Sequence, residues 1–419
     1  MPKHAVPKIA FLIAFNLLIA ITLAWFHKPI VLAAGQLVAI PAYAGSVFTS
    51  FFGSPDDYGY IDSTGHFVNG LKFQEKRRFV LDSRFSHGMA CTSYYNKPSY
   101  LTSLGAFVPV PFAKIGRFGE NSLAPVFDLD HSAWGFINTS QKLVIPCRYS
   151  EVNQFSSGLA AVRELDSKQD GLYGYIDTTG SWKIAPKFEQ AGCFSEALAP
   201  VKLGVLWGFI RPDGEFKIPP AFHFASEFHN ERAVVSKAKL GNVTDNYSCI
   251  DSNGRPVFEF TINKSAVPKP FSAYGAIPNS FDPDYKELIA NTFDYSEGLL
   301  VRQRGNKYGY CDQDGKFVIS STFDFAFPFS NGRAVVYRKN DGGGKYAIID
   351  KNGNLLSDFK FDYATSYSEN FACVYIKGRG YLYLDLAGKE AFPDTFELAY
   401  PFYEGKALVK KMTAQGLGF

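Results

Sequence analysis

The sequence predicts an all-β protein built as an array of about nine short antiparallel β-hairpin or meander repeats. Three observations predict this fold class. One short stretch, YGYIDTTGSWKIAPKFEQAGCFSEALAPVK at residues 173–202, returns in related form along the chain. Aromatic residues, which favour strands, make up 16% of the chain. No long stretch shows the 3.6-residue periodicity of an amphipathic helix.

The first predicted strand of each repeat is an aromatic-Gly-aromatic-Ile-Asp element. In a strand, Tyr173 and Tyr175 face one side, while Gly174 and Ile176 face the other. The element recurs about every 34 to 40 residues, apart from one longer interval, so the period marks a strand unit rather than a helical one. It begins at Tyr58, Trp134, Tyr173 and Trp207, with weaker copies at Tyr247, Tyr308, Tyr346 and Tyr381 and a degenerate copy near Tyr100.

A tight turn and two further strands are predicted after the opening strand. The opening Asp starts an Asp-x-x-Gly sequence, which suits a type I turn closed by a left-handed glycine. Alternation at Trp182 and Ile184 then indicates a second strand. A Phe-Ser-x-Gly-x-Ala-x-Val element follows, and residues 198–201 in it predict a third short strand. The turn sequences start at Asp62, Asp177, Asp251, Asp312, Asp350 and Asp385.

One hairpin of this size cannot bury its own hydrophobic face, but stacked neighbours can. We therefore expect the aromatic side chains to form the core between repeats. The glycine after the first aromatic residue is expected to let a neighbouring backbone or ring come close. We expect an open or superhelical stack, with a β-propeller as the alternative, because propellers usually have about four to eight blades.

These elements resemble the WG-containing repeat family, also called KWG repeats. The family unit is similar to W/Y-G-[FY]-I-[DN]-x-x-G, then [VI]-I-P, then F-x-x-G-L-A-x-V. Residues 134–162 carry it almost throughout, including Ile145-Pro146 and Gly158-Leu159-Ala160. The family is typical of bacterial proteins. The resemblance implies a β-rich repeat fold over about residues 58–411 and, by analogy, binding rather than catalysis.

The N-terminus is predicted to direct export. Residues 9–26 are apolar and uncharged and follow Lys3 and Lys8, which indicates a signal peptide or a membrane anchor. Ala42-Tyr43-Ala44 matches a cleavage sequence, so both alternatives stand. The expected organisation is a signal peptide or anchor at 1–44, a linker or cap at 45–57, the repeats at 58–411 with an insertion at about 261–292, and a tail at 412–419.

No catalytic, cofactor or metal site is predicted from the residues. The net charge of +3 gives no electrostatic sign of nucleic-acid binding. The six cysteines form no Cys-x-x-Cys pair, so we expect small buried side chains, with a disulfide as the alternative. His223 and His229 are six residues apart and match no zinc spacing. The sequence from Asp312 lacks the twelfth-position Glu of a calcium loop, so a hairpin turn is expected there.

The insertion at about 261–292 is the candidate partner-contact loop, because insertions in repeat arrays map to loops that are often on the binding face. It carries Phe271, Tyr274, Phe281 and Tyr285. The sequence therefore predicts an exported, non-catalytic binding scaffold that is periplasmic, membrane-anchored or extracellular. The expected ligand is a protein or a cell-envelope glycan. The alternative is a hydrolase that acts on a cell-wall or extracellular polysaccharide.

Overall fold

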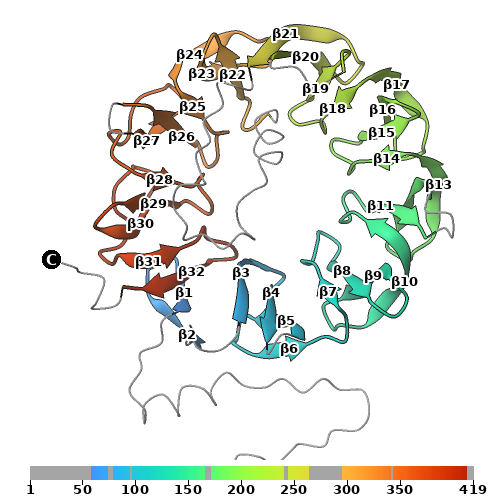
Figure 1. Cartoon of the computed structure of the whole chain (residues 1–419), viewed down its shortest axis with the longest axis horizontal. Coiled ribbons are helices and arrows are strands. Elements are labelled where there is room, and N and C mark those ends of the chain that lie inside the picture. Colours follow the sequence, from blue (N-terminus) through green and yellow to red (C-terminus); the bar gives the residue numbers. More distant parts are fainter. Residues whose placement is uncertain are drawn as a thin grey trace, which may run out of the picture. The chain divides into compact units, whose positions relative to one another are not determined.

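The computed structural model describes residues 58–73, 79–94, 97–165, 171–239, 244–263, 295–340 and 343–412. The chain divides into two compact units, Met1–Ala39 and Ile40–Phe419, and all described residues belong to the second. Every described element is a β-strand (Figure 1). Among these residues, no helix has the length and apolar character needed to cross a bilayer. The all-β prediction is therefore confirmed.

One antiparallel sheet shows the repeat in its complete form. Its strands follow the chain in the order β14 (Gln190–Ala191), β15 (Ala199–Leu203), β16 (Leu206–Ile210) and β17 (Phe216–Phe222). We name these the first, second, third and fourth strands of a repeat. The third strand carries the aromatic-Gly-aromatic-Ile element, and the second carries the Leu-Ala-x-Val element. The first strand has only two residues, too short to be predicted from sequence alternation.

The other described strands take the same four places. First strands are β3 (Phe79–Ser86), β7 (Lys114–Ile115), β18 (Phe224–Ala225), β25 (Phe325–Ala326), β28 (Tyr363–Ala364) and β31 (Phe396–Ala399). Second strands are β4 (Met89–Tyr94), β8 (Leu123–Asp128), β11 (Leu159–Glu164), β19 (Arg232–Ser236), β22 (Leu300–Arg304), β26 (Arg333–Arg338), β29 (Ala372–Ile376) and β32 (Lys406–Lys411).

Third strands are β1 (Tyr58–Asp62), β5 (Lys97–Thr102), β9 (Ala133–Asn138), β12 (Tyr173–Asp177), β20 (Thr244–Asp251), β23 (Lys307–Cys311), β27 (Lys345–Asp350) and β30 (Gly380–Leu384). Fourth strands are β2 (Phe67–Phe73), β6 (Phe107–Pro109), β10 (Leu143–Val152), β13 (Trp182–Phe188), β21 (Pro256–Asn263) and β24 (Phe317–Phe323). Counting β16, the described residues contain nine third strands, each at a position where the sequence predicts an opening element.

The first and last described strands pair with each other. β1 runs antiparallel to β32, with Tyr58 opposite Lys410 and Asp62 opposite Lys406. One sheet therefore has the order β2-β1-β32-β31-β30-β29-β28 and contains both ends of the array. Within this unit the sheets form a closed circuit (Figure 1). Meander sheets that close in this way belong to the β-propeller architecture. The pairing corrects the preference for an open stack and supports the propeller alternative.

Aromatic rings from successive parts of the repeat form the core. The Tyr175 ring lies 4.9 Å from that of Phe194, and the Tyr310 ring lies 4.7 Å from that of Phe329. Both tyrosine side chains are fully buried. Each hydroxyl donates to a backbone carbonyl 17 residues on, Tyr175 to Gly192 at 2.8 Å and Tyr310 to Phe327 at 2.7 Å. The bond satisfies a polar atom that would otherwise be costly to bury.

The glycine of the third strand lies against a bulge in the fourth strand. A Cβ on Gly174 would lie 2.5 Å from the Ile184 carbonyl oxygen, and one on Gly208 would lie 2.7 Å from that of Ile218. The strand register shifts beside both glycines. Close backbone approach therefore explains why this position is glycine in these repeats, as the sequence predicts.

Hydrogen bonds also tie each repeat to the next. The two central residues of the turn between first and second strands have positive φ, as at Glu196 (51°) and Ala197 (62°). The carboxylate of Glu196 accepts from the next turn, at the backbone N–H of Asn230 (2.6 Å) and Glu231 (2.7 Å). Ser195 donates to the carbonyl of Phe228 at 2.5 Å. We call this carboxylate contact the glutamate clamp.

The clamp recurs along the chain and crosses the closure. Glu369 accepts from the backbone N–H groups of Glu404 (2.6 Å) and Gly405 (2.7 Å). Glu404 accepts in turn from His87 (2.6 Å) and Gly88 (2.8 Å), which belong to the first part of the array. The last turn thus holds the first in the way that internal neighbours hold each other.

Candidate binding groove on the loop face

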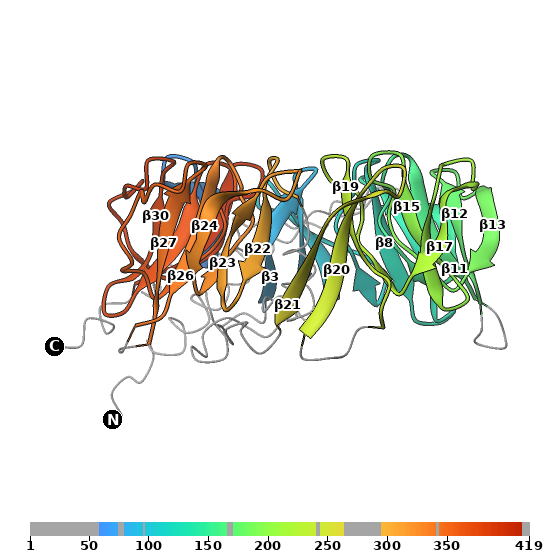
Figure 2. The ribbon, with the colours of Figure 1, turned by 90° about the horizontal axis from the view of Figure 1, so that it is seen from above.

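The two ends of the strands form two different faces of this unit. One end carries the turns between first and second strands and those between third and fourth strands, and we call it the turn face. The other end carries the loops between second and third strands, and we call it the loop face. The two edges are seen from the side in Figure 2. Turns on the turn face recur nearly unchanged, whereas loops on the loop face differ in length and composition.

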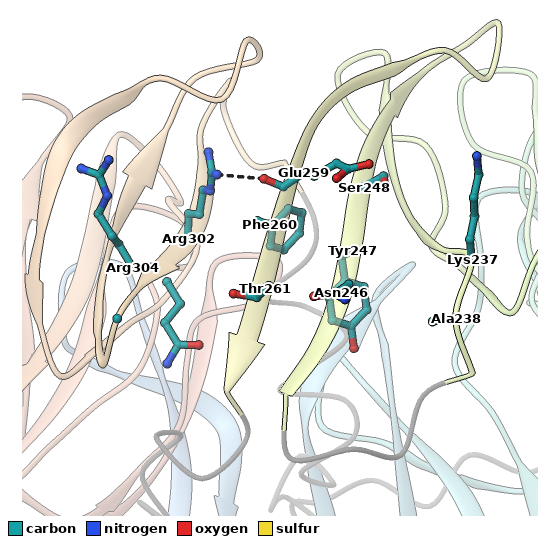
Figure 3. Close-up of a pocket in the computed structure, with 12 residues that line it drawn as sticks. Lys237, Ala238, Asn246, Tyr247, Ser248, Glu259, Phe260, Thr261, Arg302 and Arg304 are labelled. Carbon is teal, nitrogen blue, oxygen red and sulfur yellow. Dashed lines mark hydrogen bonds between the residues drawn. The ribbon is translucent and has the colours of Figure 1, made fainter.

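A groove of about 670 Å³ opens between two neighbouring repeats at the loop face. One wall comes from β20 and β21, and the other comes from β22 (Figure 3). The lining residues are Lys237, Ala238, Asn246, Tyr247, Ser248, Glu259, Phe260, Thr261, Arg302, Gln303, Arg304 and Gly305. The groove therefore combines cationic, amide, hydroxyl and aromatic side chains, which suits a polar ligand.

Arg302 joins the two walls. Its guanidinium donates from Nη2 to the carbonyl of Glu259 at 3.0 Å and from Nη1 to the carbonyl of Gly315 at 2.7 Å. The same group lies 4.9 Å from the Phe258 ring centroid and 5.3 Å from that of Phe317, within the range of cation–π contacts. Figure 3 shows the bond that crosses to β21. These contacts fix the width of the groove and leave Arg302 little freedom to rotate toward a ligand.

Arg302 stands where other repeats have valine. It pairs with Gly309 of β23, as Val201 pairs with Gly208 and Val162 pairs with Gly174. An arginine at this position of the Leu-Ala-x-Val element is visible in the sequence once the repeats are aligned by strand register. Sequence reasoning missed it because it treated the element as a uniform strand.

The floor of the groove is a rigid aromatic pair. The rings of Tyr247 and Phe260 stack with centroids 5.7 Å apart at 23° between planes. Both side chains are buried. Burial raises the pKa of the Tyr247 phenol to about 12, so it stays protonated and neutral near pH 7. The pair therefore acts as a fixed support rather than as an ionisable group.

The rim of the groove is mainly cationic. Lys237 and Arg304 are exposed, and Glu259 is the one acidic residue among the lining residues described. The Arg304 guanidinium lies 5.3 Å from the Phe317 ring centroid, which orients its side chain. The exposed positive charges would attract an anionic ligand group.

The predicted partner-contact residues Phe271, Tyr274, Phe281 and Tyr285 lie outside the described residues. The groove lies beside them in the sequence, because β21 ends at Asn263 and the description resumes at Tyr295. Sequence reasoning placed the candidate site in the insertion and did not select the strands on either side. Its signal was extra length, which does not reveal which neighbouring strands form a groove.

The Asp-x-x-Gly sequences are hairpin turns, as predicted. At Asp312 the carboxylate accepts from the backbone N–H of Asp314 (3.1 Å) and of Lys316 (2.9 Å). These bonds close the turn and leave Gly315 at a φ of 79°, which favours glycine. Within the described ranges, no group of three or more His, Cys, Asp or Glu side chains is placed to hold a metal, and this includes His223 and His229.

No disulfide joins the six cysteines, all of which lie within the described residues. Cys249, Cys311 and Cys373 are buried, whereas Cys91, Cys147 and Cys193 are partly buried. Burial raises the pKa of the Cys193 and Cys249 thiols to about 11, so they are protonated near pH 7 and weak nucleophiles. The prediction of small buried side chains is closer to the structure than the disulfide alternative.

Comparison with known proteins identifies the family to which these repeats belong. The WG containing repeat family matches residues 134–168, 173–204, 207–240, 308–342, 346–379 and 383–411. The chain belongs to the WG-containing repeat family. No curated protein matches it significantly. The WG repeats of the chain thus coincide with strands of the circuit, from β9 in the first match to β32 in the last.

Several solved structures resemble the WG-repeat circuit at low sequence identity. The computationally designed Ika8 protein matches with 11% identity and a TM-score of 0.40, covering 79% of this chain and 95% of that one. A eukaryotic initiation factor matches with 11% identity and a TM-score of 0.45, covering 75% and 84%. BamB from Moraxella catarrhalis matches with 9% identity and a TM-score of 0.33, covering 84% and 91%.

Proposed function

We propose that this WG-repeat protein is an exported, non-catalytic binding scaffold whose groove takes an acidic group of a protein or a cell-envelope glycan. The observation that carries the proposal is Arg302, which replaces the usual valine and bridges the two groove walls. A buried valine needs no polar partner, whereas this arginine requires the carbonyls and rings around it. The substitution therefore gives one pair of repeats a shape and charge that the regular pairs lack.

Charge decides the class of ligand. Arg302 directs two of its nitrogens to backbone carbonyls, so it shapes the groove. Lys237 and Arg304 are exposed at the rim and are the groups that meet the ligand. Ammonium and guanidinium groups favour carboxylate, sulfate or phosphate partners. We therefore expect acidic ligands to bind more tightly than neutral ones of the same size.

The groove supports binding better than hydrolysis. Glycosidases usually place two carboxyl groups about 5 to 10 Å apart across the scissile bond. Among the described lining residues, only Glu259 carries a carboxylate. The polysaccharide hydrolase stays as the alternative that an activity assay would reveal. Export rests on the apolar N-terminal stretch that follows Lys3 and Lys8.

Crosslinking in intact cells, followed by purification through a C-terminal tag and mass spectrometry, tests the proposal. The test variant is K237E/R304E, which reverses the rim charges. The control is K142E/K316E, which reverses two exposed charges in turns of the turn face. We expect one dominant envelope partner with the native chain and the control, and its loss with the test variant. Equal capture by both variants would exclude the groove as the binding site.

A glycan ligand would escape protein crosslinking, so the same variants are compared for binding to acidic and neutral cell-wall glycans. We expect retention of acidic glycans by the native chain and the control, and about tenfold weaker retention by K237E/R304E. Absence of both a partner and glycan retention would overturn the binding proposal. Release of glycan fragments would instead support the hydrolase alternative.

A further inference from the structure

The loop face exposes aliphatic side chains at equivalent loops of three successive repeats. Leu129 is 68% exposed in the loop after β8. Leu165 (48%) and Leu172 (38%) flank the loop after β11, and Leu203 (45%) and Val205 (70%) flank the loop after β15. We call these five residues the apolar arc. Single exposed aliphatic residues are common, but a run over adjacent repeats marks an interaction surface.

The turn face also exposes aliphatic side chains. Leu104 lies in the turn between β5 and β6 and is 87% exposed. Other exposed aliphatic residues lie beside turns of this face: Leu143 (41%) and Val144 (38%) follow the turn that starts at Asn138, and Val318 (47%) and Leu355 (50%) follow the turns that start at Asp312 and Asp350. The apolar arc differs in that its residues recur in the equivalent loop of three successive repeats, and Leu104 provides a single exposed aliphatic position on the opposite face as a control.

Basic residues occupy the same loops in the repeats that follow the arc. Lys237 and Lys239 follow β19, Lys339 follows β26 and Lys377 follows β29, all of them exposed. Arg379 in the last of these loops is also exposed but is ion-paired with Glu390. Among the described residues between second and third strands, Asp130 is the one acidic residue. The loops between second and third strands are therefore apolar in one part of the circuit and basic in another, while the connections from fourth to first strands at the same end add the acidic residues Glu189, Asp324 and Asp362.

Strand direction places both ends of the array at the loop face. β1 is a third strand, so it starts at the loop face with Tyr58 and reaches the turn face at Asp62. β32 is a second strand, so it ends at the loop face with Lys411.

From these observations we propose that the loop face docks on an anionic lipid bilayer. The apolar arc enters the interface between headgroups and acyl chains, and the basic loops meet the anionic headgroups. Buried apolar area together with attraction to anionic lipids is how proteins adhere to a membrane surface. The proposal goes beyond the groove, because the apolar arc belongs to other repeats. It also implies that ligands of the groove are molecules held near a membrane.

The test uses the full chain with an environment-sensitive fluorescent amino acid at one position. In one protein it replaces Val205 of the apolar arc, and in the matched control it replaces Leu104 on the turn face. Each protein is mixed with phosphatidylcholine vesicles containing about 30% phosphatidylglycerol, or with phosphatidylcholine vesicles alone. We expect a blue shift of emission at position 205, larger with the anionic vesicles, and no shift at position 104.

Position-specific emission separates docking from anchoring. Membrane insertion of the N-terminal segment alone would leave both positions unchanged, and that result would overturn the proposal. An equal shift at both positions would also overturn it, because it would show adhesion without a preferred face.

Charge and apolarity are tested separately. K339E/K377E is expected to bind anionic vesicles at least tenfold more weakly, whereas K142E/K316E on the turn face is expected to bind like the native chain. L129S/L203S is expected to reduce binding to both kinds of vesicle. None of these residues lines the groove, so partner capture through Lys237 and Arg304 would survive failure of the membrane proposal.

Discussion

The side chains of the turn face bind neighbouring repeats, whereas many side chains of the loop face are exposed to solvent. On the turn face, side chains such as Glu196 and Ser195 bind the backbone of the next repeat. On the loop face, Leu129, Val205 and Lys239 extend into solvent. A residue that holds a neighbouring repeat recurs because every neighbour presents the same backbone groups. A residue that does not bind a neighbouring repeat can differ from one repeat to the next. The side chains that distinguish one repeat of this WG-repeat protein from another therefore lie mainly on the loop face.

The largest expected effect comes from adding a methyl group beside the bulge. G174A would place a Cβ 2.5 Å from the Ile184 carbonyl oxygen, so the two strands must separate. We expect the free energy of unfolding to fall by about 1–3 kcal/mol, measured by chemical denaturation. The control is S248A, at the equivalent position of β20, where the repeat already has a side chain and the change removes only a hydroxyl. Equal losses in both variants would contradict the role of the bulge.

Removing one buried hydroxyl should have the next largest effect. Y310F keeps the ring that packs on Phe329 but removes the donor to the Phe327 carbonyl. A buried carbonyl left without its partner costs about 1–2 kcal/mol, seen as a lower denaturation midpoint. An unchanged midpoint would show that the hydroxyl adds nothing beyond ring packing.

The clamp at the closure should be worth as much as a clamp inside the array. E404A removes the acceptor of His87 and Gly88, and E369A removes that of Glu404 and Gly405. Because both carboxylates are solvent-exposed, we expect each variant to lose about 1 kcal/mol of the free energy of unfolding. A loss in E369A without one in E404A would contradict closure between the last and first repeats.

The smallest expected effect is a pH dependence at one turn. Hydrogen bonds to Asp177, above all from the Thr179 hydroxyl, lower the pKa of its carboxyl from 3.8 to about 2. Because the folded-state pKa is depressed, this contribution to stability is complete above about pH 4 and is lost as the pH falls toward 2. Unfolding of D177N should depend less on pH in that interval than unfolding of the native chain. An identical acid dependence would show that other groups dominate.

Local sequence predicted the repeat, but not how its ends meet. The Tyr-Gly-Tyr-Ile-Asp elements and the turns at Asp177 and Asp312 lie where the sequence places them, because strand alternation and turn chemistry act over a few residues. The pairing of Tyr58 with Lys410 was not predictable in this way. The local sequence pattern would allow any third strand to pair with any second strand. Which pair closes the circuit depends instead on the angles between all successive repeats.

The groove could be predicted only in part. The irregular spacing after β20 pointed to the right region, but the walls come from residues as distant in sequence as Lys237 and Arg302. Arg302 at a valine position was a signal available in the sequence. The glutamate clamp was another, because Glu follows Phe-Ser or Tyr-Ser at Glu196, Glu297 and Glu369. Its partner is a backbone N–H group of the next repeat, which leaves no trace in residue identity.

The pairing of β1 with β32 can form only after almost the whole chain has been synthesised. The last residue of β1 is Asp62 and the first residue of β32 is Lys406, so 343 residues separate the two strands. At a synthesis rate of about 5–20 residues per second, β1 waits roughly 20 to 70 seconds for its partner. During that interval Tyr60 and Ile61, fully buried in the closed circuit, lack part of their cover. For the export that we propose, this delay is an advantage, because a circuit that cannot close early remains open enough to be threaded through a membrane.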